Sequence, residues 1–174
     1  MDSALNAYTQ AINLDEKSAS QGLMKRGLLY LQLKQSKKAL DDFTELATLA
    51  EQTSQPEAAL SKAYFFKAKA LKKLNNLSDS VLYFEQVVRA AESDNHLAAS
   101  ALYEIAKIKI QLKDFYEAYY NLKRASHFKL KQKKLVNFRI FTEGVIFLMK
   151  RKTKTGHKLI TQLIDRLQKD TAAQ

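Results

Sequence analysis

Cysteine and tryptophan are absent from the 174-residue chain, which also has only one proline and four glycines. Without cysteine, the chain cannot form disulfides, thiolate zinc sites or a cysteine nucleophile. Because tight turns depend on glycine and proline, their scarcity argues against a β sandwich or a β barrel. These absences exclude disulfide-stabilised folds and disfavour turn-rich β folds.

Long apolar runs are also missing. The longest covers residues 145–149, whereas a transmembrane helix needs about 20 apolar residues. Residues 1–5 lack the basic segment and the apolar core of a signal peptide. We therefore expect no membrane span and an intracellular protein, in the cytoplasm or, as an alternative, in the nucleus.

The whole chain has a formal net charge of +11 at pH 7, and its positive charge is concentrated in one segment. Residues 1–122 carry 15 basic and 15 acidic side chains, whereas residues 123–158 carry 12 basic side chains and one acid, Glu143. Such asymmetry indicates a negatively charged partner: an acidic protein segment, nucleic acid or an anionic membrane surface.

A pattern of small and aromatic residues recurs along the chain. Ala4 is followed four residues later by Tyr8 and then by Ala11. Related segments, each opened by a small residue, cover residues 39–43, 80–84, 118–122 and 156–160. A second small residue lies 12 positions before each of these four segments, at Gly27, Ala68, Ala106 and Gly144. Small residues at a fixed offset let two helix backbones approach closely, so the pattern predicts repeated helix pairs.

This pattern resembles the tetratricopeptide repeat (TPR) family, and the resemblance covers the whole chain. It implies an all-α fold, a right-handed superhelical solenoid of about nine antiparallel helices in one array. The expected helices span residues 2–14, 20–33, 37–52, 57–75, 79–93, 96–112, 115–128, 131–151 and 155–169. They form an unpaired second helix of a repeat within residues 1–15, helix pairs at 20–52, 57–93, 96–128 and 131–169, and a tail at 170–174.

The first expected helix starts halfway through a repeat, so Ala4 lacks the partner that the family pattern would give it. Three interpretations stay open: a preceding helix outside this sequence, a capping role, or self-association with a second copy. Leu5, Tyr8 and Ile12 form one apolar stripe, which is compatible with a capping helix.

No catalytic constellation emerges from the sequence. His96, His127 and His157 lie about 30 residues apart, and no two share the i, i+4 spacing of a helical metal site. Adjacent carboxylates point apart on a helix, so Asp41 and Asp42 are expected on a solvated acidic face. We therefore expect a protein that is not an enzyme and that binds no cofactor or metal.

The family resemblance indicates where a partner would bind. In tetratricopeptide arrays the first helix of each pair lines a concave groove, so the matching positions are expected to face a partner. These positions are Met24, Leu28, Leu31, Phe65, Lys69, Lys72, Lys73, Tyr103, Lys107 and Phe141. The aromatic residues would anchor a peptide, a helix or a neighbouring subunit, and the lysines would select acidic or amphipathic partners. The alternative is that these lysines are only solvated.

A basic patch forms the second candidate site. Two groups of basic residues flank the helix expected at 131–151. They are Lys129, Lys131, Lys133 and Lys134, and then Lys150, Arg151, Lys152, Lys154 and Lys158. Clustered lysines can neutralise phosphates, but sequence-specific readout needs contacts to base edges, which this pattern does not identify. An acidic protein segment is therefore favoured over nucleic acid.

The sequence predicts a non-catalytic interaction scaffold or adaptor, alone or within a larger assembly. Two alternatives stay open. One is a nucleic-acid-associated factor that uses residues 123–158, and the other is the repeat portion of a peptide-sensing regulator.

Overall fold

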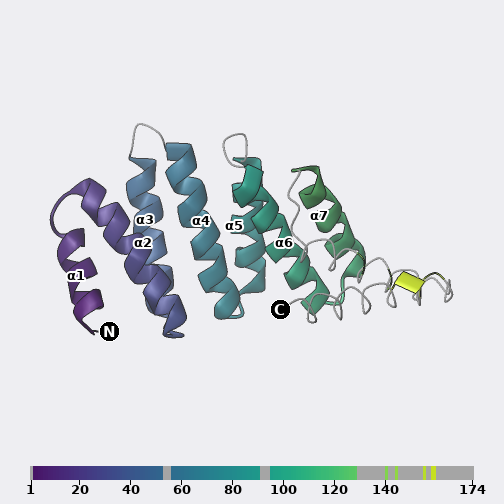
Figure 1. The fold of residues 1–174 in the computed structure, drawn as a ribbon, viewed down its shortest axis with the longest axis horizontal. Coiled ribbons are helices and arrows are strands. Elements are labelled where there is room, and N and C mark those ends of the chain that lie inside the picture. The colour runs from purple at the N-terminus through teal and green to yellow at the C-terminus, as the bar shows by residue number, and fades with distance from the viewer. Residues whose placement is uncertain are drawn as a thin grey trace, which may run out of the picture. The chain divides into compact units, whose positions relative to one another are not determined.

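A computed structural model describes residues 2–52, 56–90 and 95–128, together with residues 140, 144, 155, 158 and 159. This part of the chain contains seven helices and no strand (Figure 1), which confirms the all-α class. The helices are α1 (Asp2–Ile12), α2 (Glu16–Gln32), α3 (Ser36–Glu51), α4 (Pro56–Lys73), α5 (Leu77–Arg89), α6 (Asn95–Gln111) and α7 (Phe115–His127). Apart from the five single residues, the helices expected at 131–151 and 155–169 lie outside the described residues.

Two helices begin two or more residues earlier than expected because of their capping side chains. The start of α2 lies at Glu16 instead of residue 20, since Asp15 Oδ1 accepts a hydrogen bond from the Ser18 N–H at 2.8 Å. Likewise α5 begins at Leu77 instead of residue 79, since Asn76 is its N-cap and the Asn76 Oδ1 accepts a hydrogen bond from the Asp79 N–H at 3.3 Å. In each case the side chain satisfies a backbone donor that the first helical turn leaves unpaired.

The chain divides into two compact units, unit 1 (residues 1–101) and unit 2 (residues 102–174). Within unit 1, each helix from α1 to α4 packs against the next one along the chain, and α2 also contacts α4. Figure 1 shows these helices side by side, with alternating directions. The contact between α2 and α4 joins the first helices of two successive pairs, as expected for stacked repeats.

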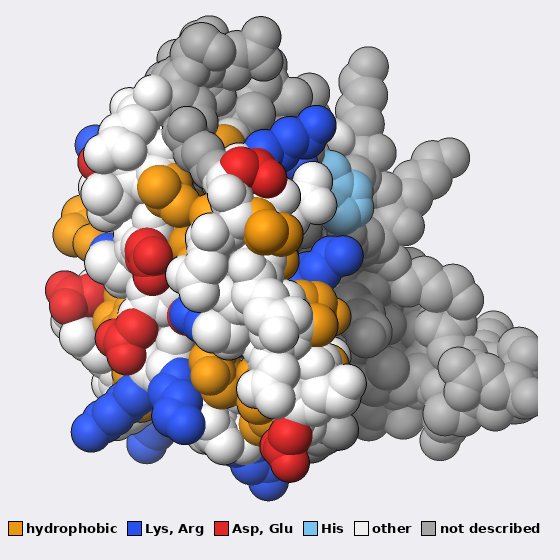
Figure 2. All heavy atoms as spheres, turned by 90° about the vertical axis from the view of Figure 1, so that its left-hand side faces the viewer, with side chains coloured by type: hydrophobic (Ala, Val, Ile, Leu, Met, Phe, Trp, Pro, Cys, Tyr) orange, Lys and Arg blue, Asp and Glu red, His pale blue; other side chains and the backbone are white. Residues whose placement is uncertain are grey.

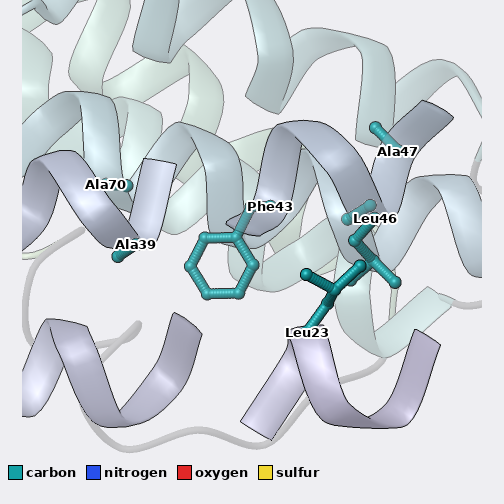
Figure 3. Close-up of a cluster of buried hydrophobic side chains, with 7 residues drawn as sticks. Leu23, Ala39, Phe43, Leu46, Ala47 and Ala70 are labelled. Carbon is teal, nitrogen blue, oxygen red and sulfur yellow. The ribbon is translucent and has the colours of Figure 1, made fainter. Parts of the chain in front are cut away.

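The core of unit 1 lies between α2, α3 and α4. Its buried members are Leu23, Ala39, Phe43, Leu46, Ala47, Ala63 and Ala70. Figure 3 shows the Phe43 ring within this cluster, with Leu23 and Leu46 pointing toward one another. Because each large apolar side chain contributes about 1.5–3 kcal/mol when fully buried, this cluster holds the first two helix pairs together.

Small residues allow close packing between paired helices. Ser80 Oγ donates to the Ala68 carbonyl at 2.9 Å, and both residues are fully buried, so α4 and α5 cross closely here as predicted. At Gly27 the nearest neighbour is an aromatic ring, since an added Cβ would lie 2.7 Å from Phe43 Cε1. Glycine at this position therefore makes room for the Phe43 ring, and the predicted approach of Gly27 to Ala39 stays a prediction.

The turns within the helix pairs share one backbone motif. Lys34, Asn75 and Lys113 have positive φ angles of 59°, 62° and 61°. After each of them, a backbone N–H donates to a carbonyl five residues earlier, from Gln35 to Tyr30, from Asn76 to Leu71 and from Asp114 to Lys109. This is the Schellman arrangement that closes helix C-termini, here without its preferred glycine.

The helix α1 forms one end of unit 1. It packs against α2 at Gly22, where an added Cβ would lie 2.8 Å from Ile12 Cγ1 and 2.9 Å from the Tyr8 carbonyl oxygen. No residue of α1 is fully buried. Figure 2 views this end of the molecule, where polar and charged side chains separate the hydrophobic ones. Such a mixed outer surface is compatible with the capping interpretation, which stays a prediction with its two alternatives.

Candidate protein-binding surface

The predicted groove residues of α2 form a partly exposed apolar row. Met24, Leu28 and Leu31 are each partly buried and pack against the core cluster of unit 1. Their i, i+4, i+7 spacing places them on one face of the helix. The row therefore contributes to folding stability and still leaves apolar surface that a partner could cover.

Phe65 lies in the interior, which corrects its expected role as an exposed anchor. Only 8% of its surface is exposed. Its ring makes edge contacts with Phe66 at 5.4 Å and with Phe84 at 5.5 Å between ring centroids. Because Phe84 belongs to α5, the part of α4 that carries Phe65 faces the following helix. A partner could reach this ring only by displacing close-packed neighbours.

Lys69 lies beside this aromatic cluster. Its ammonium group is 5.6 Å from the ring centroids of both Phe65 and Phe66. Each cation–π contact contributes about 0.5–1 kcal/mol at exposed sites, and it orders the side chain without cancelling its charge. None of the ion pairs between described residues involves Lys69. On the same helix, Lys72 is partly buried and Lys73 is exposed.

A related arrangement lies on α6 in unit 2. Lys107 Nζ is 5.4 Å from the Tyr103 ring centroid and 3.0 Å from Glu104 Oε1. Burial raises the pKa of Tyr103, the positive charge of Lys107 opposes that rise, and Glu104 adds to it. Because Glu104 already pairs with Lys107, a carboxylate from a partner would have to compete with an internal one.

The remaining predicted site residues are mostly outside the described part of the chain. These are Phe141, Lys129, Lys131, Lys133, Lys134, Lys150, Arg151, Lys152 and Lys154. Lys158 is described and exposed. Lys69 belongs to unit 1 and Lys107 to unit 2. The continuous groove and the basic patch therefore stay predictions.

One ion pair between α2 and α3, together with a hydrogen bond to α1, was not anticipated from the sequence. Arg26 Nη2 donates to Asp42 Oδ1 at 2.7 Å, and Arg26 Nη1 donates to Thr9 Oγ1 of α1 at 3.1 Å. The hydrogen bond to Asp42 raises the pKa of Arg26. Asp42 is buried, which corrects its expected place on a solvated acidic face. Arg26 directly precedes Gly27, and Asp42 directly precedes Phe43, which lies against Gly27. Their position beside this helix contact is the signal from which the ion pair could have been predicted.

The described residues hold no group of histidine, aspartate and glutamate side chains that could bind a metal ion. Among the helices of the described part, none has the length and apolar character needed to cross a membrane. The expected lack of enzyme activity and of a cofactor stays a prediction.

The sequence matches a tetratricopeptide-repeat family model at residues 20–53 and at residues 61–94. These segments are tetratricopeptide repeats. The first contains most of α2 and α3, and the second contains most of α4 and α5, so the family resemblance drawn from the small-residue spacing is confirmed. No curated protein sequence matches the chain.

Two solved TPR-type structures share the fold. MamA is 13% identical, with a TM-score of 0.73, over 98% of this chain and 91% of MamA. BtubC from P. vanneervenii is 16% identical, with a TM-score of 0.72, over 94% of this chain and 70% of BtubC. At such low identity the likeness shows the helical-repeat fold alone. Because tetratricopeptide repeats are generally a protein-interaction fold, they support a general scaffold role for this chain.

Proposed function

We propose that this TPR protein holds an acidic, amphipathic segment of another protein against α2 and α4 of unit 1. The observation that carries the proposal is Lys69, whose ammonium group lies 5.6 Å from two phenylalanine ring centroids and forms no ion pair with another described residue. The neighbouring helix α2, which contacts α4 directly, carries the partly exposed row of Met24, Leu28 and Leu31.

This combination suits a helix or peptide with two kinds of side chain. Its apolar residues would cover the α2 row, and its carboxylates would reach Lys69 together with Lys72 and Lys73. The apolar contacts would supply most of the affinity, because burying apolar area is the main driving force of association. The lysines would supply selectivity and faster encounter with acidic partners.

We further propose that Tyr103, Lys107 and Phe141 contribute to partner binding within unit 2, and that the basic patch binds acidic protein rather than nucleic acid. The recurrence of a lysine four residues after an aromatic side chain, at Tyr103 and Lys107, supports the first point. The excess of 12 basic side chains over one acid in residues 123–158 supports an acidic partner. A cytoplasmic location is compatible with such a role.

A selected peptide can test the proposal before the natural partner is identified. Random peptides of about 16 residues, displayed on phage and selected on the full chain, should be enriched in acidic and apolar residues at helical spacing. The dissociation constant of the best labelled peptide is then measured by fluorescence anisotropy. Lys69→Glu should weaken binding about tenfold or more, which corresponds to about 1.4 kcal/mol.

Lys113→Glu is the matched control, because Lys113 is exposed and lies outside α2 and α4, and the substitution changes the charge by the same amount. It should alter the dissociation constant less than about threefold, as an exposed charge outside the contact does. Equal affinities of the wild type and Lys69→Glu, or equal losses in both variants, would contradict a site at Lys69.

A further inference from the structure

Four lysines surround a depression on the surface of unit 1. Its volume is about 390 Å³, and its walls come from the turn between α2 and α3 and from the end of α4. The lining residues are Lys34, Gln35, Ser36, Lys37, Lys38, Lys73 and Leu74. Figure 1 shows the α2–α3 turn and the end of α4 at the same edge of the fold, the lower one in that view.

The charges of this depression are not neutralised from within. None of the seven lining residues is acidic. The ion pairs found among the described residues do not use Lys34, Lys37, Lys38 or Lys73. Lys38 has one aromatic contact, with its ammonium 5.5 Å from the Tyr30 ring centroid, which leaves its charge intact. Like charges grouped around one hollow repel each other and raise the local concentration of anions.

The start of α3 adds hydrogen-bond donors to the same place. Gln35, the N-cap residue, makes no side-chain hydrogen bond to the first turn of the helix. Ser36 and Lys37, which follow it, also line the depression. Backbone N–H groups at a helix start have no partner within the helix, and the helix dipole makes this end partly positive. The lysines and these donors therefore favour the same kind of ligand.

We propose that this depression binds an acidic peptide segment through several of its carboxylates. Four separate lysine charges suit several anionic groups better than one. Leu74 offers an apolar contact for a peptide side chain. None of the described residues that line the hollow is aromatic, so nucleic acid bases would lack a stacking platform among them. The cations are all lysines, which bind as point charges and lack the bidentate fork with which arginine recognises phosphate.

The site shares Lys73 with the predicted groove but includes neither Lys69 nor the α2 row. It does not depend on the proposed function, because an acidic segment could occupy it whether or not a partner covers α2 and α4. The variant Lys69→Glu should leave it intact, and this separates the failure of one proposal from the failure of the other.

The test needs a site-resolved measurement, because the basic stretch at residues 123–158 also attracts anions. We would titrate the ¹⁵N-labelled full chain with an octaglutamate peptide and follow the backbone amides of Gln35, Ser36 and Leu74 by NMR. Saturable shifts of these amides are expected, with an affinity that falls as salt rises. A neutral octaglutamine peptide should leave them unmoved.

Two variants with equal charge loss make the result specific. The first variant removes three lining lysines, Lys34→Gln/Lys37→Gln/Lys73→Gln, and keeps the contact of Lys38 with Tyr30. It should weaken the binding of octaglutamate, as measured at these amides, about tenfold or more. The control variant carries substitutions at exposed lysines elsewhere, Lys17→Gln/Lys25→Gln/Lys113→Gln. It should change the affinity less than about threefold, since these charges lie outside the depression.

Four outcomes would overturn the proposal. The amides of Gln35, Ser36 and Leu74 would stay unmoved by octaglutamate, or the two triple variants would lose the same affinity. The third is tighter binding of a uridine octanucleotide than of octaglutamate at the same amides, which would assign the site to nucleic acid. Inorganic phosphate is titrated as well, and binding as strong as that of octaglutamate would likewise contradict a peptide site.

Discussion

Two lysines at corresponding repeat positions differ in what surrounds their charge. Lys69 in unit 1 and Lys107 in unit 2 are 38 residues apart, and each lies four residues after an aromatic side chain. The residue three positions before each lysine is Phe66 in one repeat and Glu104 in the other. Phe66 places a second ring 5.6 Å from the Lys69 ammonium, whereas a Glu104 oxygen lies 3.0 Å from Lys107 Nζ.

This difference shows that one neighbouring side chain decides whether the charge of a lysine is already paired within the protein or remains available to a partner. An aromatic ring attracts an ammonium group and holds it in place without adding an opposite charge. A carboxylate neutralises the same group and makes any external carboxylate a competitor. Repeat spacing therefore predicts where such a lysine lies along the chain, but not its electrostatic state.

Converting the unit 1 arrangement into that of unit 2 has the largest expected effect. Phe66→Glu would place a carboxylate near Lys69, but Phe66 also stacks on Phe43 of the core at 5.5 Å between ring centroids. Because a partly buried ring that packs against the core is lost and a charge is introduced, we expect the free energy of unfolding to fall by about 3 kcal/mol. Urea denaturation followed by circular dichroism measures this fall.

Phe66→Leu is the control for packing alone, and it should lower the free energy of unfolding by about 1 kcal/mol. If Phe66→Glu lowered the free energy of unfolding no more than Phe66→Leu does, a carboxylate would be tolerated at position 66, and this would contradict the packing of the Phe66 ring against the core. The aromatic and the acidic versions of the repeat would then be interchangeable at this position.

A second pair of corresponding positions, Gly27 and Ala68, sharpens the comparison with a smaller effect. Gly27→Ala would bring a Cβ to within 2.7 Å of the Phe43 ring, so overpacking should lower the free energy of unfolding by about 2 kcal/mol. The matched reverse change, Ala68→Gly, should lower the free energy of unfolding by about 1–2 kcal/mol, because glycine has a lower helix propensity and a fully buried methyl group is lost. The same denaturation measurement applies.

The double variant Gly27→Ala/Phe43→Leu isolates the contact between these two residues. It should lose less stability than the two single variants lose together, because the smaller side chain at position 43 relieves the clash with the added methyl group. Strictly additive losses would mean that the Phe43 ring is not what requires glycine at position 27.

The smallest expected effect concerns the ion pair of Lys107 with Glu104. Glu104→Gln should change the free energy of unfolding by less than about 0.5 kcal/mol, because partly exposed ion pairs contribute little. It should lower the pKa of Tyr103, since the charge of Glu104 raises that pKa. The change is followed by NMR titration of the labelled tyrosine ring.

Lys107→Gln is the matched control and should move the pKa of Tyr103 upward, because the positive charge of Lys107 lowers it. Opposite shifts in the two variants are expected when both charged groups lie beside the phenol. Shifts in the same direction would contradict the arrangement on α6 and would remove the contrast between Lys107 and Lys69.

The helical class and the register of the repeats were determined by the sequence alone. The spacing of small residues and the scarcity of glycine and proline are local features, and α1 to α7 lie within about four residues of their expected ranges. The family match at residues 20–53 and 61–94 confirms the register. Helix ends were less predictable, because a cap such as Asn76 acts through a single hydrogen bond that periodicity does not report.

Only the tertiary structure decided which side chains remain accessible. Phe65 occupies a groove position of the family pattern but packs against Phe84 of α5, and Asp42 is buried beside Arg26. Lys73 joins lysines of a turn that lies almost forty residues earlier in the chain. Each outcome depends on a neighbour supplied by a distant segment. Helical periodicity assigns a residue to a face, but the packing of other helices determines what covers that face.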